Sequence, residues 1–142
     1  MTNQEKKRWL LQYRFAVREE RRLGLELEQW RARATGCTAH YGADQAGGGD
    51  GRKVEHAAER IAGVVEELER QQAECARLRL TIGKAIASVP DGRLRELLRL
   101  RYVDGLTWEQ IAEEMNYSWR QILRMHGDAL EQVTVNVMEC HT

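Results

Sequence analysis

Two long stretches of heptad-like spacing set the strongest limit on what this chain of 142 residues can fold into. In the first stretch the apolar positions alternate steps of four and three residues, which is the spacing of a coiled-coil seam. Its members are Trp9, Tyr13, Ala16, Glu20, Leu23, Leu27, Trp30 and Ala34, with Glu20 as the polar exception. Thr2 and Glu5 form a capping-box pair that marks the start. The pattern predicts one helix of roughly 45 Å.

A second seam follows with similar length and helical spacing. Its members are Val54, Ala58, Ile61, Val65, Leu68, Cys75, Leu78, Ile82, Ile86 and Val89. This helix should end before Pro90, because proline disfavours helical geometry in the residue ahead of it. Two such helices can fold back as an antiparallel hairpin or pair between chains, and the spacing leaves both arrangements open.

The two seams are separated by residues 35–53, where the helical pattern stops and five glycines fall within ten residues. Glycine at this density predicts a flexible linker. The stretch GGGDGRKV lacks the Gly-Lys-Ser/Thr ending of a phosphate-binding loop, so nucleotide binding is not expected. Residues 1–89 are therefore predicted to form a helical hairpin or coiled coil with a Gly-rich linker.

The C-terminal third of the chain contains two capped helix starts eleven residues apart. Thr107 and Gln110 form one capping box, and Ser118 and Gln121 form the next. They enclose a short helix predicted over residues 108–115, followed by a tight turn and a second helix. The preceding helix has an apolar face made of Leu94, Leu97, Leu98 and Tyr102. This arrangement predicts a helix-turn-helix.

The predicted helix-turn-helix module covers residues 90–133, and residues 134–142 form a C-terminal tail. Asn116 occupies the turn, where it can adopt the left-handed backbone that the turn requires. In the tail, alternating valines leave a frayed helix end and a short strand as open alternatives. The whole chain is expected to be all-α.

Composition excludes several function classes. No apolar run approaches the roughly 18 residues of a membrane span, so we expect a cytoplasmic protein without membrane contact. No Ser-His-Asp arrangement or HExxH motif is present, so neither enzyme activity nor a cofactor is expected. Cys37 and His40 have the spacing of half a zinc site, but Cys140 and His141 do not complete it with a suitably spaced second pair, so no metal is predicted.

The segment LRELLRLRYVDGLTWEQIAEEMNYSWRQILRMHGDAL resembles region four of bacterial sigma factors, the helix-turn-helix that reads promoters. Over its whole length, including the KKRWLLQYR start and the Gly-rich interruption, the chain is similar to phage-encoded regulators of the RinA and ArpU type. The resemblance implies control of phage or prophage transcription in a bacterial host through double-stranded DNA, with an activator role and contact with host RNA polymerase. Nothing corresponds to the promoter-melting segment of a complete sigma factor.

The resemblance also implies which residues meet DNA, because the family's recognition helix presents its first turns to the major groove. Carried over, these residues are Ser118, Trp119, Arg120, Gln121, Leu123, Arg124 and His126. Arginine can donate two hydrogen bonds to guanine, and glutamine can pair with adenine. A serine at a helix start suits a phosphate. Trp119 and Leu123 depart from the more polar sigma pattern.

Charge weighs against this assignment, since residues 90–142 carry six basic and nine acidic side chains. Further phosphate contacts could come from the basic N-terminal helix or from four arginines, which could equally form a solvated face. These arginines are Arg93, Arg95, Arg99 and Arg101. Self-association, with a dimer favoured, would raise the affinity.

Two alternatives use the same fold. The first is a phage DNA-packaging or assembly factor that depends on coiled-coil multimerisation. The second is a protein-interaction module whose helix-turn-helix does not bind DNA. Oligomer size separates the first from a regulator, because a two-fold dimer reads half-sites about 34 Å apart whereas a ring of many subunits favours packaging.

Overall fold

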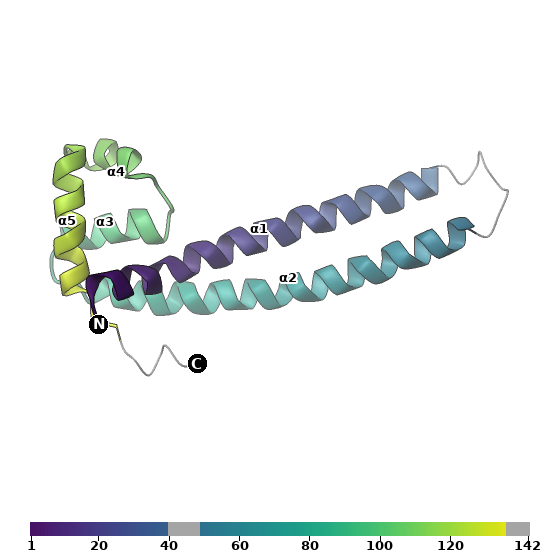
Figure 1. The fold of residues 1–142 in the computed structure, drawn as a ribbon, viewed down its shortest axis with the longest axis horizontal. Coiled ribbons are helices and arrows are strands. Elements are labelled where there is room, and N and C mark those ends of the chain that lie inside the picture. The colour runs from purple at the N-terminus through teal and green to yellow at the C-terminus, as the bar shows by residue number, and fades with distance from the viewer. Residues whose placement is uncertain (40–48, 136–142) are drawn as a thin grey trace. The chain divides into compact units, whose positions relative to one another are not determined.

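The computed structural model describes residues 1–39 and 49–135, and it contains no β-strand in these ranges. The helices are α1 (Asn3–Ala39), α2 (Gly49–Ala87), α3 (Gly92–Tyr102), α4 (Trp108–Met115) and α5 (Trp119–Gln132), as shown in Figure 1. The predicted all-α fold is confirmed. The predicted capping box at Thr2 and Glu5 is present, and α2 ends before Pro90 as expected.

The chain divides into two units, and both long helices contribute to each of them. Unit 1 comprises Met1–Ala16 together with Cys75–Thr142, and unit 2 comprises Val17–Glu74. Both long helices reach into the predicted linker of residues 35–53. The helix α1 continues to Ala39, and α2 already begins at Gly49. The rest of the predicted linker, residues 40–48, lies outside the described residues.

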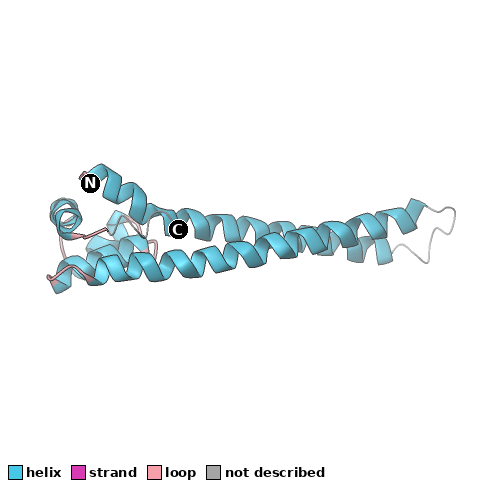
Figure 2. Ribbon diagram, turned by 90° about the horizontal axis from the view of Figure 1, so that it is seen from below, coloured by secondary structure: helices cyan, strands magenta, loops and turns pink. Residues whose placement is uncertain are grey.

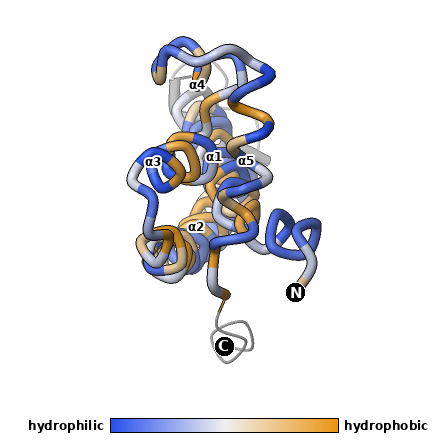
Figure 3. Tube along the Cα trace, turned by 90° about the vertical axis from the view of Figure 1, so that its left-hand side faces the viewer, coloured by the Kyte–Doolittle hydropathy of each residue, from blue (hydrophilic) through white to orange (hydrophobic). Residues whose placement is uncertain are grey.

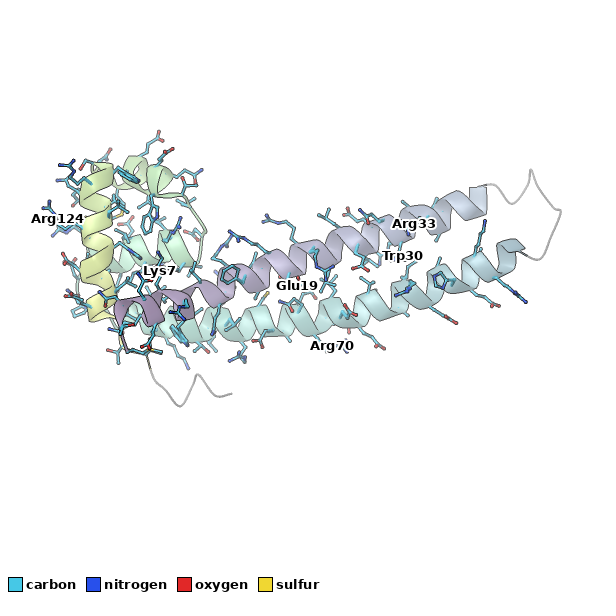
Figure 4. All side chains as sticks on the ribbon, in the orientation of Figure 1. Lys7, Glu19, Trp30, Arg33, Arg70 and Arg124 are labelled. Carbon is cyan, nitrogen blue, oxygen red and sulfur yellow. The ribbon has the colours of Figure 1, made fainter. Side chains whose placement is uncertain are left out.

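In unit 2 the segments of α1 and α2 run alongside each other in opposite directions within one chain (Figures 1 and 2). Trp30 of α1 meets the ring of His56 of α2 edge-on, with 5.8 Å between ring centroids. Arg33 lies 4.7 Å from the Trp30 ring centroid and Arg60 lies 5.9 Å from it. Figure 4 shows Trp30 beside Arg33. The contacts of Trp30 with His56 and Arg60 join α1 to α2, whereas Arg33 packs on Trp30 within α1.

The seam of α2 differs in register from the predicted one over its first half. Val54 is 41% exposed and Ala58 is exposed, whereas Ala57 and Val64 are buried. The buried and half-buried positions then alternate steps of four and three without a break as Ala57, Ile61, Val64, Leu68, Gln71, Cys75, Leu78, Ile82, Ala85 and Val89. The prediction was wrong at Val54 and Ala58 because it omitted Gln71, a polar member of the observed seam. Alternating steps of three and four counted back from Gln71 lead to Val64 and Ala57 instead.

In unit 1, α3, α4 and α5 pack against one another. Along these helices hydrophobic positions alternate with hydrophilic ones (Figure 3). Its largest fully buried side chains are Leu10, Ile82, Ile86, Val89, Leu97, Leu98, Tyr102, Ile111 and Ile122. The Lys6 ammonium donates to the carbonyl of Leu130 at 2.9 Å, and the Arg14 guanidinium donates to the carbonyl of Val103 at 3.0 Å. Each cation satisfies a carbonyl near the end of a helix, where the helix dipole favours positive charge.

The turn after α3 depends on Gly105, which generates the first prediction. Gly105 has φ of 75°, and a Cβ added there would collide with the guanidinium of Arg14. Gly105→Ala should therefore lower the free energy of unfolding, measured by urea denaturation. The left-handed backbone alone should cost about 1–2 kcal/mol, and the collision with Arg14 should add to this loss. In an Arg14→Ala background the loss should shrink to this backbone component.

The matched control is Gly63→Ala in α2, where an added Cβ meets nothing within 4 Å. This substitution should raise the free energy of unfolding by up to about 1 kcal/mol, because alanine is the better helix former. Equal stability of the Gly105→Ala variant and the wild-type protein would contradict the account of this turn.

Candidate nucleic-acid interface

The helices α4 and α5 both begin with complete capping boxes, as the sequence predicts. The Thr107 hydroxyl accepts from the amide of Gln110 at 3.2 Å, and the Gln110 side chain accepts from the amide of Thr107 at 2.9 Å. Ser118 and Gln121 repeat the pair at 3.1 Å and 2.9 Å. Between the helices, Asn116 adopts the left-handed conformation with φ of 58°. The predicted bounds of α4 and the start of α5 are thus confirmed.

Burial fixes which side of α5 faces outward. Its inner face consists of Ile122, His126, Ala129 and Leu130, all buried. The outer face begins with Ser118 and carries six exposed residues of the predicted DNA-binding set, namely Ser118, Trp119, Arg120, Gln121, Leu123 and Arg124. Figure 4 shows Arg124 pointing away from the α3–α5 core. The structure therefore exposes these six side chains along the first turns of α5, with Arg120 and Arg124 on the side opposite the buried face.

His126 is the seventh predicted residue, and the structure removes it from the candidate surface. Its side chain is 8% exposed, and its Nε2 lies 2.6 Å from the hydroxyl of Tyr102. The edge of its ring also meets Trp108 with 4.6 Å between centroids. A side chain enclosed by Tyr102 and Trp108 cannot reach a DNA groove. The expectation for His126 is corrected to that of a core residue.

Burial also sets the protonation state of this histidine. Desolvation, with a smaller contribution from the positive charges of Lys7 and Arg101, lowers the pKa of His126 to about 4. Burial raises the pKa of its partner Tyr102 above the ordinary value. At neutral pH both side chains are therefore uncharged, and the neutral imidazole can accept the hydroxyl hydrogen at Nε2.

Gln121 has less freedom to read a base than the resemblance implies. Its Oε1 accepts from the amide of Ser118 in the capping box. Bidentate pairing with adenine needs both the oxygen and the nitrogen of a glutamine amide. While the box is closed, only the Gln121 amide nitrogen is left for a base. The arginines Arg120 and Arg124 are thus the main hydrogen-bonding side chains on this face.

Charge is distributed unevenly over the candidate surface. Residues 118–127 include Arg120 and Arg124 and no acidic side chain. Exposed acidic side chains gather on α4 and toward the end of α5, at Glu109, Glu113, Glu114, Asp128 and Glu131. At the start of α5, amide groups without an intrahelical partner and the helix dipole add positive potential. The first turns of α5 can therefore attract an anion although the module as a whole is acidic.

The four arginines of α3 have different environments. Arg95 donates to the carbonyl of Val89 at 3.1 Å, and Arg101 donates to that of Leu106 at 3.0 Å. Arg101 also lies 4.3 Å from the centroid of the Trp108 ring. These two arginines hold the module together. Arg99 is exposed, and the Arg93 guanidinium donates to the Tyr117 hydroxyl at 3.0 Å, which places Arg93 beside the start of α5. The sequence suggested Arg93 without indicating this contact.

Other kinds of site find little support in the described part of the chain. Within residues 1–39 and 49–135, no group of three or more His, Cys, Asp or Glu side chains could hold a metal ion. His40, Cys140 and His141 lie outside the described residues. None of the described helices combines the length and apolar character that crossing a bilayer requires.

Comparison with known proteins places the chain in a protein family. A family of proteins of unknown function, DUF1492, matches residues 37–138, which include all of α3, α4 and α5. The match spans more than half of the chain, so the chain belongs to this family. No curated protein and no solved structure matches it.

The buried histidine predicts a pH dependence of stability. The pKa of His126 is about 4 in the folded protein against 6.5 for a free side chain, so the unfolded chain binds the proton more strongly. The stabilisation from keeping His126 neutral is present above about pH 6.5 and is lost as the pH falls toward 4. The loss can reach about 3 kcal/mol.

This loss is measured as the difference in unfolding free energy between the wild-type protein and His126→Gln from pH 7 to pH 4. The difference should shrink or reverse in sign as the pH falls, because the variant has no imidazole to protonate. A difference that stays constant over this range would contradict the assignment of His126 as a buried neutral group.

Proposed function

We propose that this DUF1492 protein is a sequence-specific DNA-binding regulator of phage or prophage transcription, of the RinA and ArpU type, in which α5 enters the major groove. The observation that carries the proposal is the exposed face of α5. This face presents Arg120 and Arg124 one turn apart, on a capped helix whose other face is buried against α3 and α4. A rigid helix with an exposed first half is the form in which helix-turn-helix proteins meet DNA.

The chemistry of this face suits double-stranded DNA. The guanidinium groups of Arg120 and Arg124 can each donate two hydrogen bonds to the O6 and N7 atoms of guanine. Ser118 and the free amides at the start of α5 suit a phosphate oxygen, and Arg93 beside Tyr117 offers a second phosphate contact. The phosphate contacts would set the position of α5, and the base contacts would set its specificity.

The acidic balance of the module limits what one copy can achieve. Glu109, Glu113 and Glu114 on α4 repel phosphates, which reduces the electrostatic component that usually dominates DNA affinity. Two linked copies compensate, because the second helix then binds at a high effective concentration. An activator that also contacts host RNA polymerase gains affinity in the same way. We therefore propose that the protein acts as a homodimer, in the bacterial cytoplasm and without enzymatic activity.

A second candidate function is phage DNA packaging or assembly, in which multimerisation matters most. Its support is an exposed stripe along the part of α2 that belongs to unit 1. The stripe consists of Ala76, Arg79, Leu80, Gly83, Lys84 and Ala87, and Leu80 is 64% exposed. Such a surface favours self-association in either function.

Oligomer size decides between the two candidates. Sedimentation equilibrium of the full-length chain should give twice the chain mass of 16.4 kDa, since a regulator with one α5 per half-site works as a two-fold dimer. A closed ring of many subunits would favour packaging instead. Leu80→Glu should shift the equilibrium toward the monomer if this stripe of α2 makes the contact.

DNA binding itself is tested by replacing both exposed arginines. Arg120→Ala with Arg124→Ala should weaken binding to a specific duplex at least about 30-fold, because each bidentate arginine contributes about 1–3 kcal/mol of discrimination. The duplex is one that the wild-type protein selects from a random library, and affinity is measured by fluorescence anisotropy. The control is Arg52→Ala with Arg70→Ala, two exposed arginines of α2 in unit 2. Equal affinity of both double variants would remove the assigned site.

A further inference from the structure

We propose that Trp119 and Leu123 recognise the C5 methyl groups of thymines, and so determine which bases α5 prefers beside the guanines bound by its arginines. This inference rests on the proposed function and adds a ligand group to it.

Trp119 and Leu123 form an unusual apolar pair on the surface. Trp119 is 55% exposed and Leu123 is 38% exposed. Exposed large apolar residues also occur at Met1, Phe15, Leu25, Val54 and Leu80. Among the side chains that the structure describes, Trp119 and Leu123 are the pair of this kind that lies one helical turn apart. Exposed apolar groups that cluster in this way mark a binding surface more often than isolated ones do.

The neighbouring charges indicate DNA as the occupant. Arg120 and Arg124 follow Trp119 and Leu123 by one residue each, so a basic stripe runs beside the apolar one. No acidic side chain occurs between residues 118 and 127, and the helix start adds positive potential. This combination of apolar and basic stripes complements a surface that is anionic and also displays isolated apolar groups.

The major groove has such a surface. The thymine methyl group is the apolar group that the base edges display there, beside the acceptor atoms O6 and N7 of guanine. One helical turn of about 5.4 Å spans between one and two base pairs at about 3.4 Å each. Two apolar side chains one turn apart can therefore meet methyl groups at neighbouring positions while the arginines reach guanine. Specificity for thymine beside guanine follows from this geometry.

Gly127 offers a probe of how closely DNA approaches the same face. It lies inside α5, three residues after Arg124 and one residue before the exposed Asp128. A Cβ added here would meet nothing within 4 Å, as is also true of Gly24, Gly63 and Gly83 in the long helices. The space around Gly127 is therefore not itself a sign of DNA, but an added Cβ would hold back a DNA backbone that came into contact with α5 at this position.

The experiment compares thymine with deoxyuridine, which lacks only the C5 methyl group. The full-length wild-type protein selects a duplex from a random library, and each thymine of that duplex is then replaced in turn by deoxyuridine. Burial of one methyl group is worth about 0.8 kcal/mol, so affinity should fall about fourfold at one or more thymines. Trp119→Ala or Leu123→Ala should bind more weakly and lose this fourfold difference. Leu25→Ala, an exposed apolar residue of α1 that is 55% exposed, should retain it.

Each alternative result has a defined meaning. If Arg120→Ala with Arg124→Ala abolishes binding but no thymine responds to deoxyuridine, this inference fails and the proposed function stands. If the wild-type protein selects no sequence at all, the proposed function fails and this inference falls with it. If Trp119→Ala binds DNA normally but no longer self-associates, the pair belongs to a contact between chains and the inference is overturned.

Gly127→Ala gives an independent readout of the close approach. This variant should melt at a higher temperature than the wild-type protein and yet bind the selected duplex at least about fourfold more weakly, a loss of about 0.8 kcal/mol. Gly63→Ala in α2 should raise the melting temperature without changing the affinity. Unchanged affinity of Gly127→Ala would show that DNA does not approach α5 at this position.

Discussion

The orientation of α5 about its own axis is the constraint on which the candidate interface depends. Ile122 and His126 are one turn apart and both buried, and His126 is further held by the Tyr102 hydroxyl at 2.6 Å. Because these two side chains point inward, Arg120 and Arg124 have to point outward. A rotation that exposed His126 would separate a buried polar pair, which is costly in a core. The core of unit 1 thus determines which residues form the outer face.

Local signals in the sequence predict much of this module. A capping box requires only residues three positions apart, so Thr107 and Ser118 locate two helix starts without any knowledge of the rest of the chain. Asn116 locates the turn for a similar reason, since its left-handed conformation is a property of one residue. The all-helical fold follows from the long seams.

Features that depend on residues distant in sequence could not be predicted in this way. His126 is polar and close to the recognition residues, which suggested an exposed side chain, but its partner Tyr102 is 24 residues away. One signal was available, because Ile122, His126, Ala129 and Val133 follow the four-three-four spacing of an inner face. In α2, Gln71 concealed the true register for the same reason, since its polarity hid its place in the seam.

The start of α5 is positive, whereas its end and the neighbouring α4 are acidic. This contrast explains how a module with a net negative charge could still bind DNA. The capping box uses Gln121 to complete the start of α5, so in the proposed complex base recognition falls to arginines and apolar side chains. Arg95 and Arg101 stabilise the core, which leaves Arg93 near the interface. Affinity in this account comes from a few well-placed contacts and from self-association, and the net charge of the module contributes little.

The most direct test of the central claim is a map of backbone amide chemical shifts as the full-length protein is titrated with its selected duplex. The account predicts that the largest changes occur in residues 118–127 and at Arg93, with smaller changes on the acidic face of α4. Changes confined to α1 and α2, or a spectrum that does not change at saturating DNA, would contradict it.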